Sequence, residues 1–116
     1  NNTGINTYYG ALRVIIDVMY NKNPLAKIIL FTPSHRDYSG LNSWGDTNAN
    51  GDTLNDFANA IREIGNYMSL DVVDLFAECN LNLTSDVNAT YDNLHPNTLG
   101  YQLIAECFIQ KMYNKL

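Results

Sequence analysis

Several kinds of residue are scarce in this 116-residue chain, and each shortage excludes a class of protein. Lysine and arginine total 7 against 12 aspartates and glutamates, which gives a net charge of −5. Nucleic acid and anionic membrane surfaces are therefore disfavoured as partners, because both require clustered positive charge. No apolar run approaches the roughly 18 residues of a membrane-spanning helix. The 46% hydrophobic content instead predicts one packed domain.

Cysteine is limited to two residues, Cys79 and Cys107. Their spacing matches neither a metal-binding set nor a redox Cys-x-x-Cys pair. A disulfide between them would require a loop after a strand to lie against the last helix. We therefore expect two ordinary thiols, and the cysteines leave the compartment (secreted, periplasmic or cytoplasmic) open.

The hydrophobic pattern alternates between helical and strand periods along the chain. Helical spacing predicts helices over residues 7–20, 53–68 and from about 98 onward. Two short, nearly continuous apolar runs, 26–33 and 70–76, predict buried parallel strands. The expected helix N-caps are Thr7, Asp52 or Thr53, and Asn97 or Thr98. On the first helix, the expected apolar face carries Leu12, Ile15, Ile16 and Met19.

The order helix, strand, helix, strand, helix predicts an α/β fold with parallel strands. Two strands form a small sheet, and at least one hydrophobic strand edge would stay open. The long polar loops 34–52 and 77–96 both follow strands, so they meet at the carboxyl edge of the sheet. Open α/β folds bind ligands at this edge.

The second of these loops contains an Asp-x-x-His-Pro turn, with Asp92, His95 and Pro96. Histidine can take a proton from a hydroxyl and return it to a leaving group, and a carboxylate on its other ring nitrogen orients it. Three residues of separation in a tight turn let both side chains face the same way. The alternative is a surface histidine in a turn where Asp92 bonds its own backbone.

The first loop offers candidate substrate contacts in Arg36, Tyr38 and Trp44. Arg36 could contact an acidic or polar group, and either aromatic ring could stack on a sugar. The alternative is a loop held by its own salt bridge and aromatic packing. Residues 46–52 of the same loop match the first half of a calcium loop, but Phe57 stands where the bidentate glutamate should be. We therefore expect a polar turn there and no metal site.

Residues 92–108, "DNLHPNTLGYQLIAECF", resemble the last conserved block of the SGNH/GDSL hydrolase family. In that block, Asp-x-x-His-Pro is followed by a glycine and an Ile-Ala helix. "TYYGAL", "AKIILFTPSHRD" and "GDTLNDFANAI" look like the rest of that family's second half, so the resemblance covers essentially all 116 residues. It implies part of a flavodoxin-like three-layer α/β/α fold with a parallel sheet, namely the last two strands and three helices.

The resemblance also implies that His95 and Asp92 belong to a Ser-His-Asp triad. The family's Gly-Asp-Ser block and its two oxyanion blocks have no match in this chain. Ser34 follows a strand but lies in no Gly-x-Ser-x-Gly elbow, so nothing evident activates it. We therefore expect residues 1–116 to be the C-terminal part of one domain, inactive without an N-terminal half in the same or a separate chain.

The expected function is that of a serine ester hydrolase that uses no cofactor. Its partners would be a small-molecule ester or an acetylated carbohydrate and the missing N-terminal half, with no nucleic acid and no membrane. The alternative is a non-catalytic α/β module that binds carbohydrate or protein through its two loops.

Overall fold

The computed structural model describes residues 7–39 and 41–115, apart from the side chain of Asp86. Its elements follow the expected order of helices and strands. They are α1 (Tyr8–Lys22), β1 (Ile29–Phe31), α2 (Leu54–Met68), β2 (Asp71–Val73), α3 (Asp86–Ala89) and α4 (Thr98–Met112). The four-residue α3 was not predicted, because so short a helix leaves no periodic apolar pattern in the sequence.

The two strands pair in parallel, with Ile29 opposite Asp71 and Phe31 opposite Val73. Each strand has three residues and is shorter than the apolar run that predicted it. The runs are longer because Ile28 and Phe76, just outside the paired residues, are also buried. In the part of the chain that the structure describes, the sheet has no third strand, so each strand has one unpaired edge.

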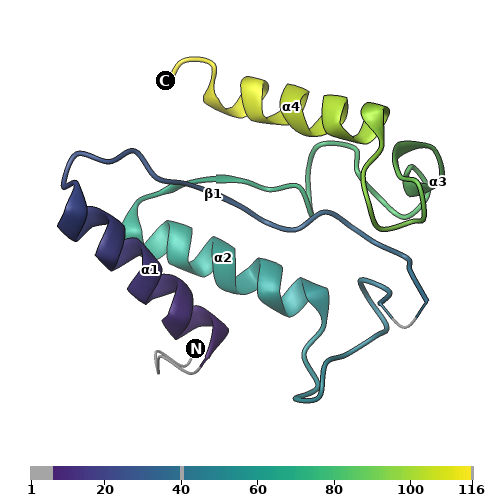
Figure 1. Ribbon diagram of the computed structural model, residues 1–116, viewed down its shortest axis with the longest axis horizontal. Coiled ribbons are helices and arrows are strands. Elements are labelled where there is room, and N and C mark those ends of the chain that lie inside the picture. Colours follow the sequence, from purple (N-terminus) through teal and green to yellow (C-terminus); the bar gives the residue numbers. More distant parts are fainter. Residues whose placement is uncertain (1–6, 40, 116) are drawn as a thin grey trace.

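The elements form three layers, with the sheet between α1 and α2 on one side and α4 on the other (Figure 1). On the first side Leu30 of β1 packs with Ile16, Ile61 and Ile64. On the other side Ile29 joins a cluster that includes Val73 of β2 and residues of α4. Successive side chains of a strand point to opposite faces, so β1 supplies both cores. The α/β fold class is confirmed.

The helix N-caps are among the predicted residues. Thr7 caps α1, Thr53 caps α2 in a capping box with Asp56, and Asn97 caps α4. In each case the side-chain oxygen accepts a hydrogen bond from a backbone N–H that the first turn would leave unpaired.

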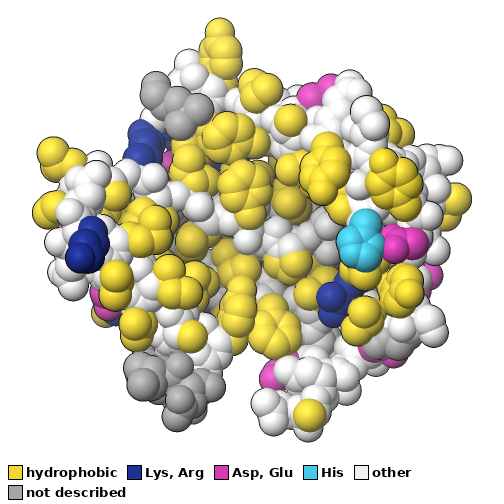
Figure 2. Space-filling view, in the orientation of Figure 1, with side chains coloured by type: hydrophobic (Ala, Val, Ile, Leu, Met, Phe, Trp, Pro, Cys, Tyr) yellow, Lys and Arg dark blue, Asp and Glu magenta, His cyan; other side chains and the backbone are white. Residues whose placement is uncertain are grey.

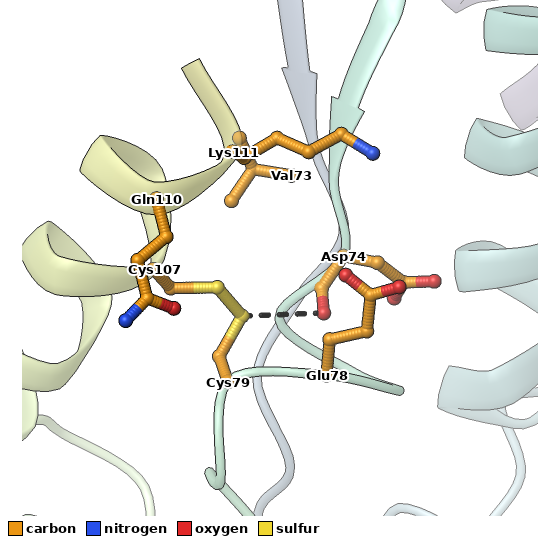
Figure 3. A pocket seen from close by; sticks show the side chains of 7 residues that line it. All are labelled: Val73, Asp74, Glu78, Cys79, Cys107, Gln110 and Lys111. Atoms are coloured by element: carbon orange, nitrogen blue, oxygen red, sulfur yellow. Dashed lines mark hydrogen bonds between the residues drawn. A yellow bond between two sulfur atoms is a disulfide. The ribbon is translucent and has the colours of Figure 1, made fainter. Parts of the chain in front are cut away.

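The expectation of two ordinary thiols was wrong. Cys79, in the loop after β2, forms a disulfide with Cys107 of α4, with 5.3 Å between their Cα atoms (Figure 3). The loop does lie against the last helix, as a disulfide requires. Sequence spacing could not show this, because the two residues are 28 positions apart and only the tertiary fold brings them together.

The apolar face predicted for α1 is only partly buried. Ile16 is 1% exposed and Leu12 is half-buried, whereas Ile15 is 56% and Met19 is 46% exposed. The helix packs through the side that carries Ile16, and this leaves the neighbouring apolar side uncovered. Figure 2 shows hydrophobic side chains gathered over β1 and along the layers on both sides of it. In the described ranges, no helix is long and apolar enough to cross a bilayer.

Candidate functional site

A polar network joins the carboxyl ends of both strands. Asp74, directly after β2, accepts hydrogen bonds from Nε of Arg62 at 2.6 Å and from Oγ1 of Thr32 at 2.8 Å. Thr32 follows β1 and in turn accepts a bond from the backbone N–H of Phe76 at 3.0 Å. Burial alone would raise the pKa of Asp74, but the bonds from Arg62, Thr32 and the N–H of Ala77 outweigh it and lower the pKa. The network fixes where both edge loops begin.

The Asp-x-x-His-Pro turn brings its two ionisable side chains together. Nδ1 of His95 lies 2.7 Å from Oδ2 of Asp92. A carboxylate only accepts hydrogen bonds, so Nδ1 carries the proton and the lone pair of a neutral ring is on Nε2. In the described part of the chain, Nε2 has no hydrogen-bond partner. The His95 side chain is 70% exposed, so Nε2 is accessible to another group.

Asp92 also holds the turn in shape. Its Oδ1 accepts the backbone N–H groups of His95 at 2.7 Å and Leu94 at 3.1 Å. These backbone bonds are the ones expected if Asp92 only shapes a surface turn. They coexist with the bond from Asp92 to the imidazole ring. The backbone and side-chain hydrogen bonds from His95 are the main reasons that the pKa of Asp92 is lowered. The carboxylate therefore stays ionised throughout the neutral range.

Backbone hydrogen bonds support this turn at its two ends and at its tip. Its two ends are joined by the backbone bonds from Tyr91 N–H to His95 O at 2.9 Å and from Asn97 N–H to Ala89 O at 3.0 Å. At its tip Asn93 has a φ of +62° and accepts the N–H of Asp37 at 2.9 Å. This last bond connects the turn to the loop that follows β1.

The three predicted substrate contacts all lie in that loop. Arg36 is half-buried and donates from Nε to the backbone oxygen of Leu41 at 2.9 Å. Tyr38 is 44% and Trp44 55% exposed. Trp44 packs edge-on against Phe76, with ring centroids 5.1 Å apart. The bond between Asp37 and Asn93 joins this loop to the His95 turn.

One buried residue of this loop, His35, was assigned no role from the sequence. His35 is 7% exposed, and its ring lies tilted against that of Phe76, with ring centroids 4.0 Å apart. Its Nε2 donates to the backbone oxygen of Phe76 at 2.7 Å. Burial lowers its pKa, so the ring is neutral at pH 7. Among the described residues, its buried Nδ1 has no hydrogen-bond partner. His35 therefore ties the two edge loops together, and no sequence motif indicated this contact.

A pocket of about 240 Å³ lies beside the disulfide (Figure 3). It is lined by Val73, Asp74, Glu78, Cys79, Cys107, Gln110 and Lys111, none of which was predicted as a site residue. Within the described ranges, no group of three or more His, Cys, Asp or Glu side chains could hold a metal ion. Residues 46–52 form the expected turn, in which Oδ1 of Asn48 accepts the N–H groups of Asn50 and Asp52.

The comparisons with solved structures place this fold among lipases and esterases. A possible lipase from Chitinophaga pinensis is 28% identical, with a TM-score of 0.80 over 97% of this chain and 62% of its own. The lipase/acylhydrolase from Enterococcus faecalis is 21% identical, with a TM-score of 0.69 over 100% of this chain and 55% of its own. An acetyl xylan esterase is 19% identical, with a TM-score of 0.65 over 95% of this chain and 56% of its own.

The chain thus spans between 55% and 62% of the length of these three structures. None of the curated proteins compared with the sequence matches it. The profile of the GDSL-like Lipase/Acylhydrolase family matches residues 1–103, which include the Asp92–His95 turn and most of the secondary structure. The chain therefore belongs to the GDSL-like lipase/acylhydrolase family.

Proposed function

We propose that residues 1–116 are the C-terminal part of a single hydrolase domain and supply the His-Asp pair of a Ser-His-Asp triad. The observation that carries this proposal is the 2.7 Å contact between His95 Nδ1 and Asp92, with Nε2 exposed at the carboxyl edge of the sheet. In the described part of the chain, no serine hydroxyl is hydrogen-bonded to His95. The nucleophile therefore comes from an N-terminal part, in the same chain or a separate one.

The exposed apolar surface supports this division of the domain. Ile15 and Met19 of α1 and Phe31 of β1 are all more than 40% exposed. β1 also has an unpaired edge. Further parallel strands packed beside β1 would pair that edge and cover these side chains, which removes apolar surface from water. This chain spans only part of the length of its structural relatives, which is consistent with such strands in the rest of the domain.

In the reaction, Nε2 of His95 takes the proton of the serine hydroxyl as its oxygen attacks the ester carbonyl carbon. The Asp92 carboxylate stabilises the imidazolium that forms. His95 then protonates the leaving alkoxide, the alcohol departs, and an acyl-enzyme remains. His95 next takes a proton from water, whose oxygen attacks the acyl carbon, and the proton returns to serine as the acid is released. Oxyanion donors come from the N-terminal part.

The substrate class that fits the loop after β1 is a carboxylic ester, including an acetylated sugar. Tyr38 and Trp44 present exposed rings, and aromatic faces suit sugar rings. Packing against Phe76 holds Trp44 in place while more than half of its surface stays open. Arg36 keeps further guanidinium donors beyond the Nε that bonds Leu41, and these suit a polar substrate group.

The test uses the complete protein, with the coding sequence upstream of Asn1, and hydrolysis of p-nitrophenyl acetate and acetylated xylan oligosaccharides. We expect Asp92→Asn to lower kcat by about 10⁴-fold and His95→Gln by about 10⁶-fold. Glu106→Gln, an exposed carboxylate of α4, is the matched control and should keep wild-type kcat. The isolated 1–116 polypeptide should be inactive. Hydrolysis by that polypeptide alone, dependent on His95, would contradict the proposal, and so would a fully active His95→Gln protein that binds carbohydrate unchanged.

A further inference from the structure

Asn97 makes more hydrogen bonds around the His95 turn than a helix cap requires. Its Oδ1 accepts the N–H of Gly100 at 3.1 Å, which is the capping bond of α4. Its Nδ2 donates to the backbone oxygen of Asn88 at 2.7 Å and to that of Thr90 at 3.3 Å. Its own N–H donates to Ala89 O at 3.0 Å. One residue therefore joins α3, the start of the turn and the first turn of α4.

The hydrogen bonds at position 97 distinguish asparagine from the other common helix caps. Serine and aspartate cap helices about as well as asparagine, because capping needs only an acceptor. Neither can donate two hydrogen bonds to backbone carbonyls, whereas a carboxamide has two N–H donors and an acceptor. The second function of Asn97, to bind the oxygens of Asn88 and Thr90, thus requires its amide group.

These bonds lie close to His95 along the chain. Asn97 is separated from it only by Pro96, whose ring restricts the backbone. Thr90 forms an isolated bridge with Pro96 on the opposite arm of the turn, and its Oγ1 accepts the N–H of Asn93 at 2.8 Å. A shift of Asn97 relative to Thr90 would therefore move both arms of the turn, and His95 and Asp92 with them.

The His95 turn and the N-terminus of α4 are closely packed at Gly100. A Cβ atom on Gly100 would lie 2.2 Å from Ala89 O and 3.0 Å from Cβ of Pro96. The first turn of α4 is thus in close contact with both arms of the turn, and Gly100 allows this approach. Within that contact, Asn97 supplies the directional bonds that set the relative position.

We propose that Asn97 is a positioning residue for His95 and that its two amide donors, beyond its role as helix cap, set the place of the base in the active site. This inference rests on the proposed hydrolase function. It predicts that the donors affect the chemical step, because a catalytic group displaced by about 1 Å can cost about a hundredfold in rate.

The experiment compares Asn97→Ser and Asn97→Asp in the complete protein, since both keep the capping acceptor and neither has the two amide N–H donors. We expect kcat for p-nitrophenyl acetate to fall about tenfold to a hundredfold, with KM changed less than about twofold. Thr53→Ala removes the equivalent cap of α2, far along the chain, and should keep kcat. Wild-type kcat in Asn97→Ser, or an equal loss in Thr53→Ala, would overturn the proposal.

Backbone hydrogen exchange in the same proteins gives a second readout that needs no catalysis. Amides of residues 91–95 should exchange about fivefold to tenfold faster in Asn97→Ser, while those of α2 stay unchanged. Unchanged exchange at 91–95 would overturn the positioning role. Wild-type protein without His95-dependent hydrolysis would refute the proposed function instead, and the exchange result would still decide whether Asn97 holds the turn.

Discussion

Asp74 is the residue through which the carboxyl ends of the two strands are joined. Its carboxylate accepts bonds from Arg62, from Thr32 and from the N–H of Ala77 at 3.1 Å, and its side chain is only 15% exposed. A largely buried carboxylate is stable only when it is paired and hydrogen-bonded, as it is here. The same group orients the loop after each strand, so its effect on stability extends to the candidate site.

Asp74→Asn should lower the free energy of unfolding by about 2 kcal/mol at pH 7, because a charge-assisted pair with Arg62 is lost. The pKa of Asp74 is lower when folded than when unfolded. Its contribution is therefore complete above the unfolded value of about 3.9 and is lost as pH falls through the folded value. Urea unfolding between pH 3 and 7 measures this effect. The free energy of unfolding should fall less on acidification in Asp74→Asn than in wild type. Identical acid slopes would contradict this assignment.

Among the elements, α4 is attached to the rest of the fold both at its N-terminus and at its middle. Its N-terminus follows the His95 turn directly, and the disulfide from Cys107 attaches its middle to the loop after β2. Leu103, Ile104 and Phe108, like the two cysteines, pack against the buried cluster that includes Val73. The closed segment between the cysteines contains α3 and the whole Asp92–His95 turn, so the disulfide restrains the segment that carries the candidate base.

Replacing both cysteines by serine should lower the free energy of unfolding of the complete protein by about 3–4 kcal/mol. This is the chain-entropy value for a loop of this length, 28 residues of separation. The measurement is urea unfolding with and without dithiothreitol. The reductant should destabilise wild type and leave the double variant unchanged. Equal sensitivity of both proteins would show that the disulfide does not stabilise the fold.

At the scale of the whole molecule, the layers are narrow along the viewing direction of Figure 1. The structure measures 41 × 38 × 19 Å, and Figures 1 and 2 look along the shortest direction. The sheet is only two strands wide, so helices and sheet together leave apolar side chains open on this face. In our proposal the N-terminal part of the domain covers the exposed side of α1.

Ile15→Gln tests this arrangement in the complete protein. If the N-terminal part covers Ile15, the substitution should lower the free energy of unfolding by about 1.5–3 kcal/mol, as expected for a buried aliphatic side chain. Leu25→Gln is the matched control, since Leu25 is 92% exposed in the turn between α1 and β1 and should change stability by less than about 0.5 kcal/mol. Urea unfolding measures both. Equal effects would mean that α1 is solvent-exposed in the complete protein.

Local patterns predicted much of the fold. Helical spacing located α1, α2 and α4, and the apolar runs located both strands, because these signals reside in neighbouring residues. The cap Thr7 was predicted outright, and Thr53 and Asn97 were each predicted as one of two neighbouring residues, since capping depends on residues within one turn. The Asp92–His95 contact belongs to the same category, as it closes over three residues.

The amino-acid sequence alone thus predicted every element except α3, the order of these elements, the family resemblance and the local chemistry of the His95 turn. Only the tertiary structure decided which side of α1 is buried, that Cys79 reaches Cys107, that His35 joins the two edge loops, and that Asp37 bonds Asn93. The physical reason is distance along the chain. These contacts join residues separated by many positions or distinguish two apolar faces of one helix, and no local pattern records what each face will meet.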